Sequence, residues 1–341
     1  MSPSRETRPR VKLADVAQRA GVSVTTASFV LSGRTDMRIS ADTTNRVLHA
    51  ARELDYRLNL TARSLRTQTS STIGLIADTI ASRPYGGDMI QGALTAALTH
   101  QHRMLVCETD GARAVENALI EDLLGRRVDG FLYATGSHDA VTVPPALRGQ
   151  RVVLLNNVAR ARVPSVVPDE VEGGATAARV LLEAGHREGI HVVGETPADL
   201  IPARGRLKGI VDALQAAGTR LAGQVDCEWS PDSAYDAMSA ALARGPRPAA
   251  VICLNDRVAF GVYQAMTDAG LRIPDDLSVV SFDDSELAGW LRPGLTSVAL
   301  PLFEMGVRAV ETLLASDPMP RLQRVQMALR RRGSVGPPPP R

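Results

Sequence analysis

The chain has 341 residues, of which 44% are hydrophobic, 22% charged and 4% aromatic. This length exceeds one ordinary domain, and the composition is that of a globular protein whose cores are built from aliphatic side chains. No apolar run approaches the length that crosses a bilayer, and the N-terminal residues contain no apolar segment of the kind that directs secretion. We therefore expect a cytoplasmic protein with more than one domain.

The net charge of +2 conceals an uneven distribution along the chain. Residues 1–70 contain 12 Lys and Arg against 6 Asp and Glu, whereas the remaining residues contain 27 against 31. A basic segment on a mildly acidic body indicates that only this segment meets a polyanion. The three cysteines, Cys107, Cys227 and Cys253, are far apart and show no metal-binding spacing, which is typical of a reducing compartment.

The basic segment predicts three short helices. Gly21 suits the left-handed end of the first helix, Ser23 is placed to cap the second, and the third begins after Ser40. Two short helices joined by a glycine turn form a helix-turn-helix. The inward positions expected from apolar spacing are Leu13, Val16, Ala17 and Ala20, then Ala27, Val30 and Leu31, then Val47, Leu48, Ala51 and Leu54.

In a helix-turn-helix, the start of the second helix enters the major groove of DNA. Val24 and Thr25 would face base edges there, while the hydroxyls of Thr26 and Ser28 are placed to contact phosphates. The alternative is a helical pair used for protein contacts. The pattern alone favours DNA binding without excluding that alternative.

Residues 11–66 resemble the lactose-repressor (LacI/GalR-type) family. The matching segments are "VKLADVAQRAGVSVTTASFVLSG", "RISADTTNRVLHAARELDYRLN" and "ARSLRT". Many relatives have Arg where this chain has Phe29, which removes a guanine contact; Phe29 either touches a thymine methyl or packs in the protein. Relatives usually have Pro where this chain has Leu58, so the entry to the next segment is less rigid.

The resemblance implies that the segment 59–66 becomes a hinge helix only on operator DNA. Leu65 matches the residue that wedges open the minor groove, and the flanking Arg63 and Arg66 can reach phosphates. The alternative is that Leu65 packs against the following domain. The full set of predicted DNA-binding residues is Ser23, Val24, Thr25, Thr26, Ser28, Phe29, Arg34, Asn59, Arg63, Leu65 and Arg66.

From residue 72 onward, strand-like and helical segments alternate. Such alternation predicts parallel sheets covered by helices, with ligand sites at the carboxyl ends of the strands. The region is too long for one small sheet, so we expect two lobes with a cleft. The strands are expected at 73–77, 103–107, 130–133, 152–155, 190–193, 250–253 and 277–282, and the helices at 87–98, 114–124, 171–184, 206–217, 234–243 and 257–269.

The family resemblance continues through "VPDEVEGGATAARVLLEAGHREGIHVVG", "RGRLKGIVDAL" and "RPAAVICLNDRVAFGVYQAMTDAGLRIPDDLSVVSFDD". It implies an all-α helix-turn-helix head plus an α/β core of two Rossmann-like lobes of the periplasmic-binding-protein type I architecture, with crossovers near Val167, Thr296 and Arg324. The expected organisation is a DNA-binding head at 1–57, a hinge helix and linker at 58–70, a core at 71–325 and a disordered Pro-rich tail at 336–341. Within the core, the N-lobe covers about 71–167 and 297–323 and the C-lobe about 168–296 and 324–335.

The candidate effector-binding residues lie at strand ends. Asn255 offers a donor and an acceptor, Asp283 a carboxylate for hydroxyls, and Arg206, at the start of a predicted helix, a planar fork for diols or carboxylates. The resemblance adds an aromatic that stacks on the ligand, Trp229, and two further cleft positions, Asn156 and Asp169. Asp78 and Tyr85 follow the first strand at the expected mouth of the N-lobe.

Each candidate also has a structural interpretation. Asn255 could cap the helix that follows it, Asp283 could cap a turn, Arg206 could form a surface salt bridge, and Trp229 could pack within a lobe. His186 is expected to be a charge or cap at a helix end.

No motif of a hydrolase, P-loop enzyme or metalloprotease is present, and the six histidines show no metal-binding spacing. We therefore expect no enzyme activity, cofactor or metal.

The expected function is that of a sequence-specific transcriptional regulator, with repression as the expected role. It would bind a palindromic operator as a homodimer, and the helices near 87–98 and 302–314 would form the contact between the two subunits. A sugar or nucleoside effector would bind between the lobes. The rivals are an exported binding protein and a regulator without ligand control; effector identity, operator sequence and tetramer formation are left open.

Overall fold

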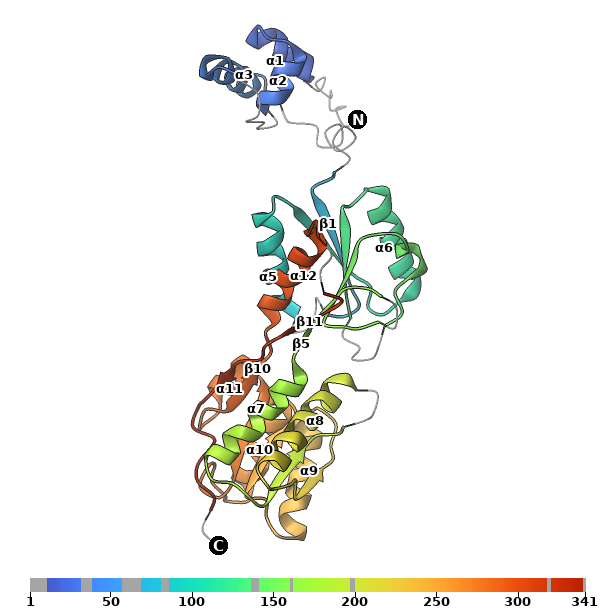
Figure 1. Cartoon of the computed structure of the whole chain (residues 1–341). Helices are drawn as coiled ribbons and strands as arrows, with labels where there is room; N and C mark the ends of the chain where they lie inside the picture. Colours follow the sequence, from blue (N-terminus) through green and yellow to red (C-terminus); the bar gives the residue numbers. More distant parts are fainter. Residues whose placement is uncertain are drawn as a thin grey trace, which may run out of the picture. The chain divides into compact units, whose positions relative to one another are not determined.

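The computed structural model describes residues 11–31, 39–56, 69–80, 86–135, 141–159, 162–196, 200–317 and 320–339. The chain divides into two compact units, Met1–Ser70 and Ser71–Arg341 (Figure 1). Within the described ranges, no helix is long and apolar enough to cross a membrane. The predicted residues Arg34, Asn59, Arg63, Leu65, Arg66 and Tyr85 lie outside the described residues.

The head contains α1 (Leu13–Ala20), α2 (Val24–Leu31) and α3 (Ala41–Glu53). Gly21 ends α1 with a φ of +65°, a left-handed conformation that glycine adopts without strain. The Ser23 hydroxyl accepts a hydrogen bond from the Thr26 N–H at 3.1 Å, and the Ser40 hydroxyl accepts one from the Thr43 N–H at 3.2 Å. The helix ends predicted from the sequence are therefore present.

One predicted inward position in the head is wrong. Leu48 is 37% exposed, whereas Ala50 and Ala51 are buried. Val47, Ala50 and Ala51 follow the spacing of one helix face, and Leu48 lies about 100° further around the helix. The buried side chains of this small core are Val16, Ala17, Ala20, Ala27, Val47, Ala50 and Ala51.

The N-lobe is built on an all-parallel sheet with the strand order β11-β5-β4-β3-β1-β2. Helices α5 (Gly86–Thr99) and α12 (Leu302–Leu314) lie side by side on one face, and α6 (Arg113–Gly125) covers the other (Figure 1). Because both faces are covered, the central strands are apolar along their length. The strands are β1 (Thr72–Ala77), β2 (Arg103–Glu108), β3 (Gly130–Ala134), β4 (Val152–Leu155), β5 (Ser165–Pro168) and β11 (Leu322–Val325).

The C-lobe sheet has the order β12-β10-β9-β8-β6-β7, and β12 is antiparallel to β10. Helices α7 (Glu170–Glu183) and α8 (Ile201–Ala216) cover one face, and α9 (Pro231–Arg244) and α10 (Asp256–Asp268) cover the other. A short helix, α11 (Glu286–Trp290), follows β9. The strands are β6 (Ile190–Val193), β7 (Gly223–Val225), β8 (Ala250–Cys253), β9 (Ser278–Asp283), β10 (Thr296–Ala299) and β12 (Leu329–Arg330).

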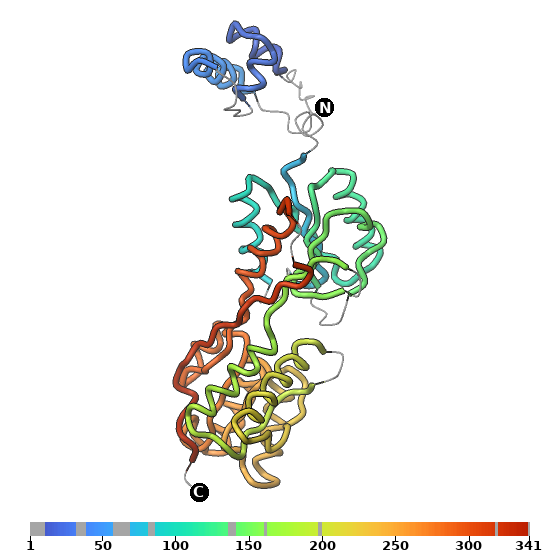
Figure 2. Tube along the Cα trace, viewed as in Figure 1, coloured from blue at the N-terminus to red at the C-terminus, as the bar shows by residue number. Residues whose placement is uncertain are grey.

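The chain passes between the lobes three times, from β5 to α7, from β10 to α12 and from β11 to β12 (Figure 2). The second passage differs from the sequence prediction near Thr296. That residue begins β10, which pairs along its whole length with β9 of the C-lobe, so the passage follows Ala299. The two-lobed α/β fold is as expected, with lobe limits displaced by a few residues.

The C-terminal segment also differs from the expected disordered tail. The Gly336 N–H donates to the Ser278 hydroxyl at 3.1 Å, and the Gly336 carbonyl oxygen lies 3.0 Å from His186 Nε2. His186 is only 1% exposed, so it is a buried link between the end of α7 and this segment and not a solvated cap. Burial lowers the pKa of the His186 imidazole, while the contact with Gly336 acts in the opposite direction.

Close contact between α5 and α12 depends on glycine. A methyl group added at Gly92 would lie 2.0 Å from the Phe303 carbonyl oxygen, and one at Gly306 would lie 2.1 Å from the Met89 carbonyl oxygen. The two helices therefore approach backbone to backbone, which a larger residue would prevent.

Gly92→Ala is therefore expected to lower the free energy of unfolding by about 1–3 kcal/mol, because α5 and α12 must separate. Urea unfolding followed by circular dichroism measures this. Gly87→Ala is the matched control on the same helix, since its added methyl meets no atom within 4 Å. The control should change stability by no more than about 1 kcal/mol, and equal losses in the two variants would contradict the packing argument.

Candidate functional site

The carboxyl ends of the strands in both lobes meet at a cavity of about 220 Å³. Parallel sheets bind ligands at this edge because the loops and helix starts that follow the strands converge there. Five of the eight predicted effector-binding residues line the cavity. They are Asn156, Arg206, Trp229, Asn255 and Asp283.

Arg206 is the central charged group of this cavity. Its Nε lies 2.7 Å from Glu170 Oε2, its Nη2 lies 3.3 Å from Glu170 Oε1, and its Nη1 donates to the Leu254 carbonyl oxygen. The side chain is 3% exposed, which excludes the surface salt bridge considered from the sequence. Burial alone would lower the pKa of the guanidinium, but the carboxylates of Glu170 and Asp283 outweigh it and raise the pKa, so Arg206 stays charged.

The position of Arg206 in its helix also differs from expectation. Helix α8 begins at Ile201, with Pro202 in its first turn, so Arg206 lies in the second turn. Proline is tolerated at that place because the first N–H groups of a helix have no partner within the helix. A methyl group added at Gly174 of α7 would lie 2.1 Å from the Arg206 carbonyl oxygen, so close packing of α7 and α8 holds Arg206 beside Glu170.

Asp283 contributes a carboxylate that faces Arg206. Its Oδ1 lies 3.8 Å from Arg206 Nη1, and its φ of +105° is a conformation that side-chain-bearing residues rarely adopt. Two residues later, Ser285 binds the buried Asp256 carboxylate through both its N–H and its hydroxyl, each at 2.8 Å. This anchor fixes the strained turn that aims Asp283 at the cavity.

Burial raises the pKa of Asp283 well above its usual value, with Arg206 acting in the opposite direction. A carboxyl whose pKa is raised in the folded state binds a proton that the unfolded state releases. Its effect on stability is therefore absent below a pH of about 4, which is the pKa of an aspartate in the unfolded chain. As the pH rises from there toward the pKa of Asp283 in the folded state, the folded state loses stability.

Asp283→Asn should remove this contribution. We expect the variant to gain stability relative to the unchanged protein as pH rises above about 4, and to show no such gain below it. Chemical denaturation at a series of pH values measures the difference. A difference that is constant with pH would contradict a raised Asp283 pKa.

Asn255 and Trp229 each have two roles. Asn255 Oδ1 accepts from the Val258 N–H at 2.7 Å and caps α10, while its side chain also lines the cavity. The Trp229 indole N–H donates to the Glu195 carbonyl oxygen at 3.0 Å, and its ring centroid lies 5.5 Å from Arg206 Cζ. The structural interpretations considered for these two residues are therefore compatible with ligand contact.

The structure does not bring two predicted residues to this cavity. Asp169 Oδ1 accepts from the Glu172 N–H at 3.3 Å and caps α7, and Asp78, just after β1, is not among the lining side chains. Sequence reasoning missed Glu170, the residue after Asp169. The signal for it was Arg206 itself, because a buried guanidinium requires a carboxylate partner.

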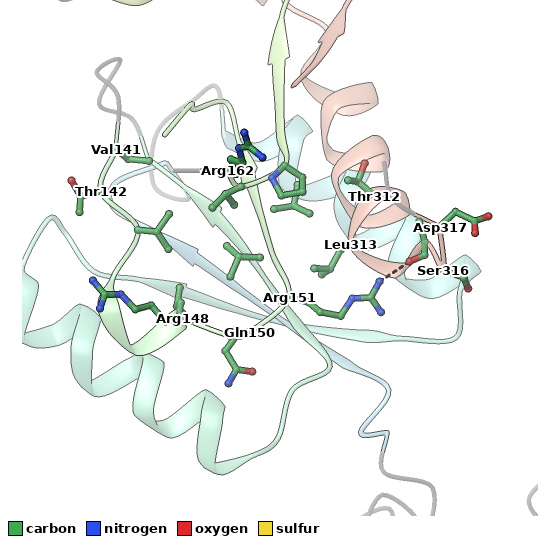
Figure 3. Close-up of a pocket in the computed structure, with 18 residues that line it drawn as sticks. Val141, Thr142, Arg148, Gln150, Arg151, Arg162, Thr312, Leu313, Ser316 and Asp317 are labelled. Carbon is green, nitrogen blue, oxygen red and sulfur yellow. Dashed lines mark hydrogen bonds between the residues drawn. The ribbon is translucent and has the colours of Figure 1, made fainter. Parts of the chain in front are cut away.

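A larger cavity of about 1080 Å³ lies elsewhere in the N-lobe, beside the start of β4 and the end of α12 (Figure 3). Its polar groups include Arg148, Arg151 and Arg162, and Arg151 donates to the Ala315 carbonyl oxygen at 2.6 Å. These arginines are exposed at the amino ends of the strands. Of these two cavities, the one of about 220 Å³ is lined by several buried polar side chains, Arg206, Asn255 and Asp283, so it is the better ligand site.

In the head, the amino end of α2 presents Val24, which is 49% exposed, and the exposed Thr25. The hydroxyls of Ser23 and Thr26 lie 2.8 Å apart and are engaged in the helix cap. Ser28 and Phe29 are half-buried on the same helix. Val24 and Thr25 are therefore the most accessible of the predicted contacts on α2.

Comparison with known proteins agrees with the helix-turn-helix head and with the two-lobed α/β core. Residues 12–59 match the family of bacterial regulatory proteins called the lacI family, and residues 178–335 match a periplasmic binding protein-like domain. The ribose operon repressor of Escherichia coli (strain K12) is 32% identical over 324 residues, which cover 92% of this chain and 96% of the relative. The chain belongs to the LacI family.

Solved structures of other family members have the same fold as this LacI-family chain. The lac repressor dimer bound to operator and the anti-inducer ONPF is 26% identical, with a TM-score of 0.78, and the match covers 96% of this chain and 99% of that one. The transcriptional regulator CelR in complex with cellobiose is also 26% identical, with a TM-score of 0.66 and a coverage of 95% and 100%. The head is thus a DNA-binding helix-turn-helix, and the chain is a transcriptional regulator and not an enzyme.

Proposed function

We propose that this LacI-family regulator is a cytoplasmic repressor that binds a palindromic operator as a homodimer under the control of a small polyhydroxylated effector, a sugar or a nucleoside. The observation that carries the proposal is the convergence of Arg206, Asn255 and Asp283 on the interlobe cavity. A fork of N–H donors, an amide and a carboxylate are suited to bind neighbouring hydroxyls. The CelR relative, solved with cellobiose, supports this chemistry.

Dimerisation is proposed through the N-lobe face formed by α5 and the edge strand β2. Leu98 of α5 is 68% exposed, and Leu105 and Val106 of β2 are 38% and 41% exposed. An apolar edge strand beside an apolar helix face favours association because both would otherwise remain in water. Phe303, at the start of the adjacent α12, is 45% exposed and extends this face. The lac repressor relative is a dimer on its operator, which supports the assignment.

For the DNA side, we propose that Val24 and Thr25 contact base edges while Ser23, Thr26, Ser28, Phe29 and Arg34 complete the contact surface. Asn59, Arg63, Leu65 and Arg66 would form the hinge segment, with Leu65 as the minor-groove wedge. An effector that favours one lobe orientation would change how the two N-lobes meet at the face of α5 and β2 in a dimer, and with it the separation of the two hinge segments. The effector can shift DNA affinity only by its different affinities for the two states.

Selection of duplexes from a random pool by the purified protein tests this proposal. We expect enrichment of a palindrome with two half-sites, and release of the selected duplex by at least one sugar or nucleoside. A chain that binds DNA without response to any such compound would favour the alternative, a regulator without ligand control. No enrichment over random competitor would contradict the proposed function.

A further inference from the structure

The turn that carries Asp283 contains two successive residues in left-handed conformations. Asp283 has a φ of +105° and Asp284 a φ of +55°. Residues with side chains rarely adopt such values, and they keep them only where neighbouring groups hold the backbone in place. Asp283 is the residue of this turn that lines the effector cavity. The contacts that hold Asp284 therefore help to decide where the Asp283 carboxylate lies.

The side chain of Asp284 is held by two arginines of the C-terminal segment. Arg332 Nη2 lies 2.6 Å from Asp284 Oδ1, and Arg330 Nε lies 3.6 Å from Asp284 Oδ2. The Asp284 side chain is 17% exposed and that of Arg332 is 29% exposed, whereas that of Arg330 is 60% exposed. The contact with Arg332 is shorter and better shielded from water, so it is the stronger of the two.

Arg332 is itself fixed to the beginning of β10. Its backbone N–H donates to Thr296 Oγ1 at 3.0 Å, and its Nη1 donates to the Leu295 carbonyl oxygen at 2.8 Å. Two residues later, the Ser334 hydroxyl accepts from the Thr296 N–H at 2.8 Å. The guanidinium therefore reaches Asp284 from a backbone that is bonded on both sides of Arg332. A planar group held in this way also fixes the carboxylate that it binds.

The same turn is bound to the segments that pass between the lobes. The Asp283 carbonyl oxygen accepts from the N–H of Leu300, which lies between β10 and α12, at 3.2 Å. The Ala299 N–H donates to the Ala328 carbonyl oxygen at 2.8 Å, which joins this passage to the one that leads from β11 to β12 and on to Arg332. Asp283 is thus held through its backbone by one passage and through Asp284 by the continuation of another.

We propose that Arg332 is a positioning residue of the effector site. Its side chain is not among those that line the described cavity, so it acts on the effector through the turn and not by contact. The ion pair with Asp284 holds the turn in the conformation that directs the Asp283 carboxylate into the cavity. A binding group must be held within about 0.5 Å of its productive position, and groups behind the binding residues provide this support. The inference rests on the proposed function and adds to its site a residue of the C-terminal segment.

Arg332→Gln is expected to weaken effector binding about tenfold, the scale on which loss of a supporting contact acts. The probe is the compound that binds the unchanged full-length protein most tightly in a panel of monosaccharides, disaccharides and nucleosides, measured by calorimetry. Asp284→Asn should weaken the same probe in the same way, from the other side of the ion pair. The double variant should bind it no more weakly than the weaker single variant, because both changes remove one contact.

Arg331→Gln is the matched control on the neighbouring residue. Arg331 pairs with Glu183, and these two side chains are 57% and 58% exposed, so the control should change affinity by no more than about twofold. Arg332→Lys keeps the charge near Asp284 and should recover part of the affinity lost in Arg332→Gln. Equal effects of Arg331→Gln and Arg332→Gln would overturn the proposal, and so would a loss of unfolding free energy in Arg332→Gln without a loss of affinity.

Crystal structures of the unchanged protein and of Arg332→Gln test the same point without an effector. In the variant, we expect residues 283–284 to leave their positive φ values and the Asp283 carboxylate to move by more than about 0.5 Å relative to Arg206. An unchanged turn would overturn the inference even if affinity fell. If no compound of the panel bound the unchanged protein, the proposed function would fail, and the two crystal structures would still decide whether Arg332 holds the turn.

Discussion

Arg206→Met is expected to lower the free energy of unfolding by about 3–5 kcal/mol, because it leaves buried carboxylates without their cation. Glu170 loses two contacts, at 2.7 and 3.3 Å, and Asp283 loses the charge 3.8 Å from its Oδ1. The Leu254 carbonyl oxygen also loses its donor. The variant should lose effector binding as well, since the cavity loses its central donor. Urea unfolding and calorimetry with the effector measure the two effects.

A matched control for this variant is Arg179→Met on α7. Arg179 pairs with Glu172, but these side chains are 47% and 51% exposed, so water compensates for the lost contact. The control should change stability by no more than about 1 kcal/mol. The double variant Arg206→Met/Glu170→Gln should recover part of the lost stability, because the uncompensated carboxylate is removed. Equal losses for Arg206→Met and Arg179→Met would refute the central role of the buried pair.

Removal of residues 1–70 should abolish operator binding and leave effector binding intact. The second unit, Ser71–Arg341, contains its own sheets and apolar clusters, so it should fold without the head. The deleted segment contains the DNA-binding helices and 12 of the 39 Lys and Arg residues. Electrophoretic mobility shift with the selected operator and calorimetry with the effector separate the two activities.

The intact protein should also lose operator affinity steeply as salt increases, because each phosphate that it neutralises releases counterions. Operator retardation by the truncated core, or salt-independent binding by the intact protein, would contradict the assignment of the head. Circular dichroism of the truncated core would verify that it remains folded.

Most of the head, and most of the order of strands and helices along the chain, was predictable because these features depend on residues that are neighbours in the sequence. Gly21, Ser23 and Ser40 end or cap helices through contacts with residues three or four positions away. Apolar runs such as Val152–Leu155 gave strands because a sheet covered on both faces has no polar positions. The short edge strands β7 and β12 were missed, since three and two residues are too few for a periodic pattern.

The candidate site was only partly predictable. Asn255 and Asp283 could be proposed because Asn255 comes two residues after β8 and Asp283 is the last residue of β9, and the carboxyl ends of parallel strands meet at one edge. Asp78, predicted from its place after the first strand, and Asp169, taken from the family resemblance, do not line the described cavity, because position in the chain does not say which way a side chain points. The extra turn of α8 before Arg206 was missed because Pro202 resembles a helix boundary and instead lies within the first turn.

The sequence by itself determined the helix-turn-helix, the alternation of strands and helices and the family to which the chain belongs, since each is written in local spacing or in long matching segments. Only the tertiary structure decided that Glu170, 36 residues before Arg206, is its partner, and that Asp256 holds the turn of Asp283 through Ser285. Contacts of this kind depend on how α7 packs on α8 and how the lobes face each other, and no periodicity along the chain encodes them.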